Sequence, residues 1–539
     1  MDYILNTLRS IRLPARYYSL VVPAIATVIV LTILFNIIDS HINAFVPLPK
    51  FLSKSKQREL PKTRGDNILY GGHFFPHREW MVPRHLDKFE KLFLDSYLEY
   101  RAFLDRQSRT YADAVKNYKK RYNRSPPPGF DKWFSYAQTK ASLVIDDYDS
   151  IEESIAPYRN MPQKEFLHRM EELRVYDNVF RIAEYKVIER NELMKGQGLW
   201  HLLDWDFFYD LPEGFLMYIN TWDEPFVFPQ ELNRTQKIEF FDLGRKPWWP
   251  ALLEHCNVWE GRNSKYVRKN DRHDYIATIQ DAKEALDLCA HPEYEGMHGF
   301  FNAPGSLMVT KQLVPIFSVS KLSVFKDLLL PSAAPWHPEF LGNGGIKDFV
   351  GKTKKLYWRG SATGGDNNGD NVLKSHRSRL ASISQEHPDL IDAKVTTYFG
   401  DLEGLQQQWR EFGEPERTDH GAENNFSFLM DMDGHGLSGR YYRLLRSKAV
   451  VFKSTAVQQW HDDRMFPWVH YIPIRLGMKE LAETVKWFAT TERGDEIGRR
   501  IAEEADWWSR TGVREDDANV YTYRLFLEYA ALFVEPRPN

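Results

Sequence analysis

The strongest candidates for chemistry in this chain are a serine and an arginine that follow a glycine-rich turn. The stretch NFSFLMDMDGHGLSGRYYRLLRSKAVVFK has the pattern of a strand, a turn, a helix and a second strand, at residues 425–432, 433–436, 437–448 and 449–453. Ser438 and Arg440 would lie in the first helical turn, where free backbone N–H groups and the helix dipole favour an anion. A diphosphate fits such a site, but the same glycines could equally turn an ordinary strand–helix–strand unit.

The elements around this stretch predict a parallel sheet. From residue 355 strand and helix patterns alternate, with strands at 355–360, 392–399 and 468–474 and helices at 371–387 and 403–412. Repeated strand–helix units form a parallel sheet covered by helices, and ligands lie beyond the carboxyl ends of its strands. Arg359, Gly360 and Ser361 would therefore share one rim with the segment 434–440.

The rest of the chain is predicted to be helical at both ends. Helical patterns fill 85–122, 131–138, the 145–158 stretch, 162–195 and 478–535. A Pro-rich break at 125–130 makes Asp131 a candidate N-cap. Between these regions, strands are expected at 215–220 and 313–320, and a helix is expected at 322–330.

Composition excludes several classes of protein. The chain has 539 residues with a net charge of −3, so it is long enough for two to four domains and gives no reason to expect a nucleic-acid partner. Its two cysteines, Cys256 and Cys289, allow one disulfide and argue against a structural zinc site.

The N-terminal region predicts a membrane anchor. Residues 17–38 carry no charged side chain, and about 20 apolar residues suffice to span a bilayer. No clear cleavage site follows, which favours an uncleaved anchor with a short cytoplasmic tail and a lumenal body. Three Asn-X-Ser/Thr sequons, at Asn123, Asn233 and Asn425, are compatible with that topology.

Several motifs in order resemble glycosyltransferase family 90, the capsule-associated xylosyltransferase-like and protein O-glucosyltransferase-like proteins. The resemblance covers roughly residues 120 to 535. Its motifs are PPPGFDKWF (126–134), LVPIFSVSK (313–321), LYWRGS (356–361), HPDLIDAKV (387–395), DGHGLSGRYYRLLRSKAVVFK (433–453) and PWVHYIPI (467–474). It implies an α/β, GT-B-like fold of two facing Rossmann-like domains, and inverting transfer from a UDP-sugar without a metal or other cofactor.

With this resemblance the chain can be divided into domains. The expected parts are a tail at 1–16, a transmembrane anchor at 17–38, a stem at 39–84, a helical region at 85–195, an acceptor domain at 196–340, a UDP-sugar domain at 341–477 and C-terminal helices at 478–539. The protein would be a single-pass type II membrane protein of the Golgi or endoplasmic reticulum.

The resemblance also assigns candidate site residues. Around the nucleotide it implies Arg359, Gly360, Ser361, Gly436, Ser438 and Arg440, whose cationic groups would neutralise the leaving diphosphate. Inversion needs one general base for the acceptor hydroxyl. Asp223, in the loop after a strand, and Glu192 are the two named candidates, and a third, unidentified group remains open.

Two Asp-X-Asp triplets, 204–206 and 431–433, have the form that binds a divalent cation in some glycosyltransferases. The triplet is short and arises by chance, and the arginines offer a metal-free route, so no metal is expected. The function expected is transfer of xylose or glucose from a UDP-sugar to a hydroxyl of a glycan or protein. The alternative is an inactive, membrane-tethered carbohydrate-binding or scaffold protein on the same fold. Hydrolase motifs are absent from the sequence.

Overall fold

A computed structural model describes part of the chain. The described residues are 69–70, 80–81, 86–176, 182–189, 192–193, 207, 210–212, 215–229, 237–258, 279, 281–332, 336, 345–365, 375–397, 416, 418 and 421–534. Contacts divide the chain into two units, Met1–Leu86 and Asp87–Asn539. In the first, β1 (Leu69–Tyr70) pairs antiparallel with β2 (Trp80–Met81).

The predicted tail and anchor, 1–38, lie outside the described residues. Among the residues that are described, no helix has both the length and the apolar character needed to cross a membrane.

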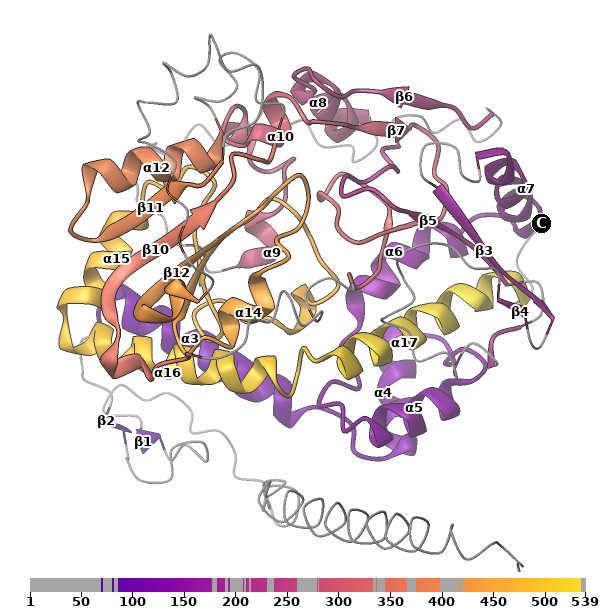
Figure 1. The fold of residues 1–539 in the computed structure, drawn as a ribbon. Coiled ribbons are helices and arrows are strands. Elements are labelled where there is room, and N and C mark those ends of the chain that lie inside the picture. Colours follow the sequence, from indigo (N-terminus) through magenta and orange to yellow (C-terminus); the bar gives the residue numbers. More distant parts are fainter. Residues whose placement is uncertain are drawn as a thin grey trace, which may run out of the picture. The chain divides into compact units, whose positions relative to one another are not determined.

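The C-terminal sheet of the second unit is parallel, as the strand–helix alternation predicts. Its strands, in spatial order, are β11 (Ile391–Val395), β10 (Thr353–Gly360), β12 (Phe426–Met432), β13 (Val450–Ser454) and β14 (Ile472–Pro473). β12 lies at the centre, and its residues from Ser427 onward are buried. Because all five strands run the same way, the carboxyl ends of β10 and β12 meet at one edge (Figure 1).

The N-terminal sheet is mixed. Its order is β4 (Glu192–Leu193), β3 (Ile182–Glu189), β5 (Leu216–Asn220), β8 (Ile316–Ser318) and β9 (Leu328–Leu329). β3 pairs antiparallel with β4 and β5, whereas β5, β8 and β9 are parallel. A small separate pair consists of β6 (Phe240–Asp242) and β7 (Met308–Thr310), which run antiparallel.

One helix prediction in this region, 322–330, is wrong, and another, 162–195, holds for α7 (Gln163–Leu173) but is wrong at its C-terminal end. The segment 182–193, expected to be helical, forms β3 and β4; its sequence IAEYKVIE alternates charged and apolar residues from Glu184 to Val187, which suits a strand. The segment 322–330 contains β9 and no helix. Here the carboxylate of Asp327 accepts hydrogen bonds from the backbone N–H groups of Phe226 and Val227, at 2.9 and 2.8 Å. These bonds tie the segment to a neighbouring loop.

Helices surround the sheets, as predicted for both ends of the chain. They are α3 (Lys88–Asp105), α4 (Tyr111–Tyr122), α5 (Phe130–Thr139), α6 (Asp149–Arg159), α7 (Gln163–Leu173), α15 (Leu481–Thr490), α16 (Glu492–Ser509) and α17 (Glu515–Val534). The predicted N-cap of α5 is wrong: Gly129, with φ +83°, holds that position and Asp131 lies in the first turn. Glycine reaches this left-handed conformation without strain.

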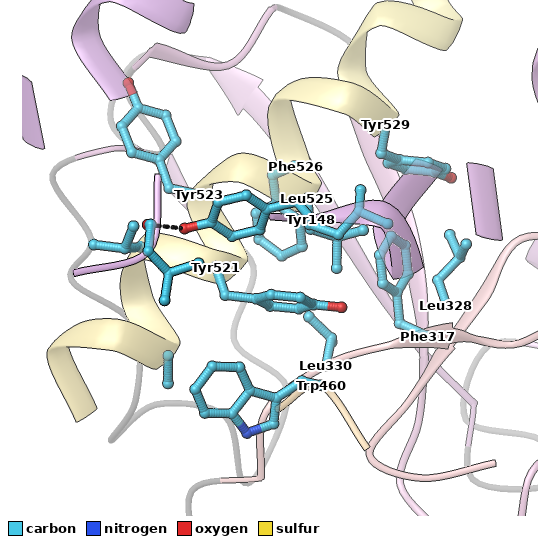
Figure 2. Close-up of a cluster of buried hydrophobic side chains, with 14 of the residues drawn as sticks. Tyr148, Phe317, Leu328, Leu330, Trp460, Tyr521, Tyr523, Leu525, Phe526 and Tyr529 are labelled. Carbon is cyan, nitrogen blue, oxygen red and sulfur yellow. Dashed lines mark hydrogen bonds between the residues drawn. The ribbon is translucent and has the colours of Figure 1, made fainter. Parts of the chain in front are cut away.

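The last two helices connect the two sheets. α16 packs on β13, and α17 packs on α5, α6 and α7 (yellow in Figure 1). On α17, Tyr529 packs on Phe317 of β8 with ring centroids 5.0 Å apart, and Tyr521 packs on Trp460 at 5.4 Å (Figure 2). Trp460 follows β13, so one continuous core holds both sheets in place.

The two cysteines are paired. A disulfide joins Cys256, in α8 (Trp249–Val258), to Cys289, which follows α9 (Ala282–Ala285).

Candidate functional site

The glycine-rich stretch has the predicted strand and turn but a shorter helix. α14 spans only Tyr441–Leu445, so Ser438 precedes the helix and Arg440 is its N-cap residue. The backbone is in a turn at Gly439 and Arg440, and the Ser438 hydroxyl donates to the carboxylate of Asp431 at 2.5 Å. The prediction of a helix from 437 to 448 is therefore wrong. With one turn and a half of helix, an anion site here depends on side chains and not on the helix dipole.

Two arginine side chains meet at the carboxyl edge of the C-terminal sheet. Arg440 Nη1 donates to the carbonyl oxygen of Arg359 at 2.6 Å. Arg377, in α12 (His376–Glu386), donates through Nη1 to the carbonyl oxygen of Ser361 and through Nε and Nη2 to that of Asp433, at 2.6, 2.9 and 2.6 Å. Both guanidinium carbons lie over the ring of Trp358, at 5.8 Å for Arg377 and 5.7 Å for Arg440.

The electrostatics of this arginine pair favour an anion. Burial lowers the pKa of Arg440; burial and the charge of Arg440 lower the pKa of Arg377 to about 9. Within the described ranges no carboxylate lies at ion-pair distance from either guanidinium. The two positive charges are met by carbonyl groups, by the Thr363 hydroxyl at 2.6 Å from Arg377 Nη1, and by more distant acids. Like charges held together out of water are costly unless a counter-charge joins them. A cavity of about 310 Å³ is lined in part by Trp358, Arg359 and Arg440, whereas Arg377 does not line it.

Arg359 is on the predicted rim, but its charge is already paired. Its Nη2 lies 2.8 Å from Asp392 Oδ1 and 2.8 Å from Glu416 Oε1, and its guanidinium stacks over Tyr357 at 4.6 Å. The main chain of this segment still contributes, because the Arg359 carbonyl positions Arg440. A nucleotide contact for the Arg359 side chain stays a prediction.

Gly360 and Ser361 shape the same corner. A Cβ atom at Gly360 would lie 2.6 Å from the Trp358 ring and 2.9 Å from Arg440 Nη2, so a side chain here would displace the arginine. The Ser361 carbonyl holds Arg377. Sequence reasoning missed Arg377, although it lies within the predicted helix at 371–387, because it is one of several basic residues in the run KSHRSR. In the structure it lies in the first turn of α12.

The described Asp-X-Asp triplet organises the turn. Asp431 accepts from Lys453 Nζ at 2.7 Å as well as from Ser438. The carboxylate of Asp433 accepts from the Thr455 hydroxyl at 2.6 Å and the Ala456 N–H at 2.7 Å. Over the described ranges, no three His, Cys, Asp or Glu side chains are grouped so as to hold a metal ion. The other triplet, 204–206, lies outside the described residues.

The candidate base Asp223 is brought to this turn by a close backbone approach. It follows β5, is exposed, and its carbonyl accepts from the Ser320 hydroxyl at 3.2 Å. A Cβ atom at Gly436 would lie 2.5 Å from that carbonyl oxygen, so only glycine lets the two loops come this close. Gly436 therefore acts by letting the loop from the N-terminal sheet approach the turn that contacts Arg377.

A second carboxyl, which sequence reasoning missed, lies next to Asp223. Glu224 is 4% exposed and accepts from the Ser306 hydroxyl at 3.1 Å. Burial raises its pKa to about 7, with a smaller contribution from the charge of Asp223. A carboxyl of such pKa can exchange a proton near neutral pH. The other predicted base, Glu192, lies in β4, and its side chain is outside the described part of the structure.

Two further contacts join the loops of the two sheets at this site. His298, the N-cap residue that precedes α10 (Gly299–Asn302), stacks on His376 of α12 with ring centroids 3.8 Å apart. The backbones of Lys321 and Gln458 exchange two hydrogen bonds, of 3.2 and 2.6 Å. The candidate site is thus assembled from both sheets, although its arginines come from the C-terminal one.

Comparisons with known proteins relate part of the chain to a family of transferases. Residues 305–537 match the model of glycosyl transferase family 90. Protein O-glucosyltransferase 3 of Rattus norvegicus is 25% identical over 230 residues, which is 40% of this chain and 42% of that protein. Protein O-glucosyltransferase 1 of Homo sapiens is 25% identical over 246 residues, covering 40% and 57%. The O-glucosyltransferase rumi homolog of Anopheles gambiae is 25% identical over 249 residues, covering 41% and 57%. The chain thus spans about half the length of these curated relatives.

Proposed function

We propose that this chain, which matches the model of glycosyl transferase family 90 through residues 305–537, transfers a sugar from a UDP-sugar to a hydroxyl of a glycan or protein. The observation that carries the proposal is the arginine pair. Arg377 and Arg440 present two positive charges to one corner, at the strand edge where α/β sheets bind ligands. A nucleoside diphosphate supplies the two negative charges that this corner lacks.

In the proposed reaction the arginine pair stabilises the leaving group. The acceptor oxygen attacks the anomeric carbon from the side opposite the diphosphate, and the bond from that carbon to the diphosphate oxygen breaks. Negative charge develops on the departing UDP, and guanidinium groups fixed by carbonyl oxygens are already oriented to meet it. The pair therefore takes the role that a divalent cation would otherwise have, and the proposed transfer needs no metal.

The acceptor proton goes to a carboxylate, for which we propose Asp223. Its loop crosses the turn at Gly436, next to the turn carbonyl that holds Arg377. One base and one displacement invert the anomeric centre. Glu224 and Glu192 are the alternatives, and the variants Asp223→Asn, Glu224→Gln and Glu192→Gln separate the three: only the base variant should lose transfer while UDP binding is kept.

The remaining features belong to the same proposal. Two five-stranded sheets with joined loops support a GT-B arrangement of two Rossmann-like domains. The names of the relatives specify glucose for those proteins; for this chain xylose and glucose are both proposed donors. A type II anchor in the Golgi or endoplasmic reticulum is a further prediction, tested by locating the full-length protein in cells.

The test is a donor screen with the full-length chain in EDTA, scored by UDP release from UDP-xylose, UDP-glucose and other UDP-sugars. Release that depends on Arg377 and Arg440 is expected for at least one donor. If no UDP species bound, the transferase proposal would fail. UDP binding without release under any acceptor would favour the inactive carbohydrate-binding alternative.

A further inference from the structure

A second cavity, of about 360 Å³, lies near the site but is lined by different side chains. The backbone contact between Lys321 and Gln458 separates this cavity from the candidate site. Successive side chains of an extended backbone point to opposite faces: Lys321 and Gln458 line this cavity, whereas Ser320 and Val457 line a small space beside the turn at 433–436. The cavity therefore lies behind the loop that holds Asp223.

One wall of the cavity carries polar groups that are enclosed yet incompletely bonded. Lys321 is 7% exposed, and its ammonium group donates to the Asp327 carbonyl at 2.8 Å and the Ser154 hydroxyl at 3.2 Å. An ammonium group has three donors, so one remains. Gln459 is 4% exposed, and its Nε2 has no hydrogen-bond partner within the described residues. Buried donors of this kind are normally satisfied.

The cavity also contains a hydrogen-bond acceptor. Asp462 accepts from the Gln459 N–H at 2.9 Å, and its side chain keeps 36% of its surface exposed where it lines the cavity. Tyr294 and Tyr471 also line the cavity. Donors, an acceptor and aromatic side chains thus surround one space.

This mixture disfavours an anionic ligand. Four cations besides Lys321 line the cavity: Lys283, Lys326, Lys453 and Arg475. Two of them are paired, because Lys453 lies 2.7 Å from Asp431 and Lys283 lies 2.6 Å from Glu153. Asp462 and Asp463 also line the cavity. Burial raises the pKa of both side chains, for Asp462 to about 7, so they repel phosphate only in their ionised form. A neutral molecule with many hydroxyl groups can accept from Lys321 and Gln459 while it donates to Asp462.

We propose that this cavity is a saccharide-binding site, separate from the arginine pair, that takes one or two neutral sugar rings. Its volume lies in the range of small-molecule sites, and hydroxyl groups match its donors and acceptor. The inference rests on the residues of the cavity and not on the proposed transfer. A sugar bound here would also bridge Lys321 and Gln459, on either side of the contact that connects the two sheets.

The test measures binding of methyl xyloside, methyl glucoside and methyl mannoside to the full-length chain by saturation-transfer NMR and calorimetry. Any detergent used must lack a sugar head group. Gln459→Leu and Asp462→Asn should each weaken the bound glycoside at least tenfold. The exposed Asp348→Asn is the matched control, because Asp348 is 84% exposed, and it should leave binding unchanged. Arg440→Ala, which removes an arginine of the other site, should also leave it unchanged.

Three results would overturn the inference: no glycoside binds, Arg440→Ala and not Gln459→Leu abolishes binding, or inorganic phosphate displaces the sugar. If a cavity variant does not fold, hydrogen exchange of the wild type decides. Added glycoside should slow exchange at 457–463 and not at 434–440; the reverse would contradict the site. UDP binding is measured in the same samples. A protein that binds UDP but no glycoside contradicts the saccharide site alone, whereas loss of UDP binding contradicts the proposed transfer.

Discussion

Removal of one member of the arginine pair is the most informative perturbation. In Arg440→Ala the guanidinium that donates to the Arg359 carbonyl at 2.6 Å is lost. A hydrogen bond to a charged group contributes about 1.5–3 kcal/mol, so the dissociation constant of UDP should rise roughly 10- to 150-fold. Because charge grows on the leaving diphosphate, turnover should fall further, by about 10²–10³-fold, as when one oxyanion donor is removed.

The same substitution should disturb the ligand-free fold very little. The lost hydrogen bond from the charged guanidinium costs about 1.5–3 kcal/mol, but the charge that lowers the pKa of Arg377 is removed as well, and these effects oppose each other. Thermal unfolding of the free protein should therefore shift by only a few degrees, on the order of 1 kcal/mol in a chain of this size. The stabilisation by added UDP should shrink strongly.

The assay compares UDP calorimetry and UDP-release rates for wild type, Arg440→Ala and a matched control. Arg446→Ala is that control, because Arg446 is the C-cap residue of α14 and donates to the Ser509 carbonyl at 3.3 Å. It should bind UDP like the wild type. A folded Arg440→Ala protein with wild-type UDP affinity and turnover would refute the diphosphate role.

Three further predictions concern the loops, the buried acids and the disulfide. Gly436→Ala places a Cβ 2.5 Å from the Asp223 carbonyl; it should lower the free energy of unfolding by about 1–3 kcal/mol and remove most of the turnover. The control Gly439→Ala, with nothing within 4 Å of its Cβ, should be nearly neutral. Equal denaturant midpoints for the two variants would contradict the close approach. Burial raises the pKa of Glu504 to about 7. Its protonated form therefore contributes fully to the free energy of unfolding below its pKa in the unfolded chain, about 4.5, and this contribution is lost as the pH rises through 7. Glu504→Gln, which keeps the acceptor for Tyr100, should stabilise by up to about 3 kcal/mol above pH 7 and not at pH 4. Glu483→Gln, at a side chain 46% exposed, is the control, and a gain independent of pH would refute the reasoning. Cys256→Ser should lower stability by about 3–4 kcal/mol for a closed loop of 33 residues, an effect that reduction of the wild type should reproduce; unchanged melting after reduction would show that the crosslink contributes little.

Much of the C-terminal sheet could be predicted from sequence because its signals are local. Buried apolar runs such as 426–432 and 450–454 alternate with helical patterns, and that alternation requires parallel strands. The errors arose where distant residues decide. The strand at 182–189 depends on pairing with β5, and the segment at 322–330 depends on the bonds from Asp327 to Phe226 and Val227.

The candidate site shows the same limit. The sequence places Arg359 and Arg440 on one rim, but it does not reveal that Asp392 and Glu416 pair with Arg359. Nor does it show that Arg377 joins Arg440 over Trp358. Residue types identify which groups can carry charge, whereas three-dimensional neighbours determine which charges stay available for a ligand.

The central claim is that the arginine pair binds a nucleoside diphosphate without a metal. The most direct measurement is calorimetry of UDP and of uridine against the full-length chain in EDTA. UDP should bind, and uridine, which lacks the diphosphate, should bind at least about 100-fold more weakly. Equal affinity for the two, or UDP binding only after a divalent cation is restored, would contradict the account.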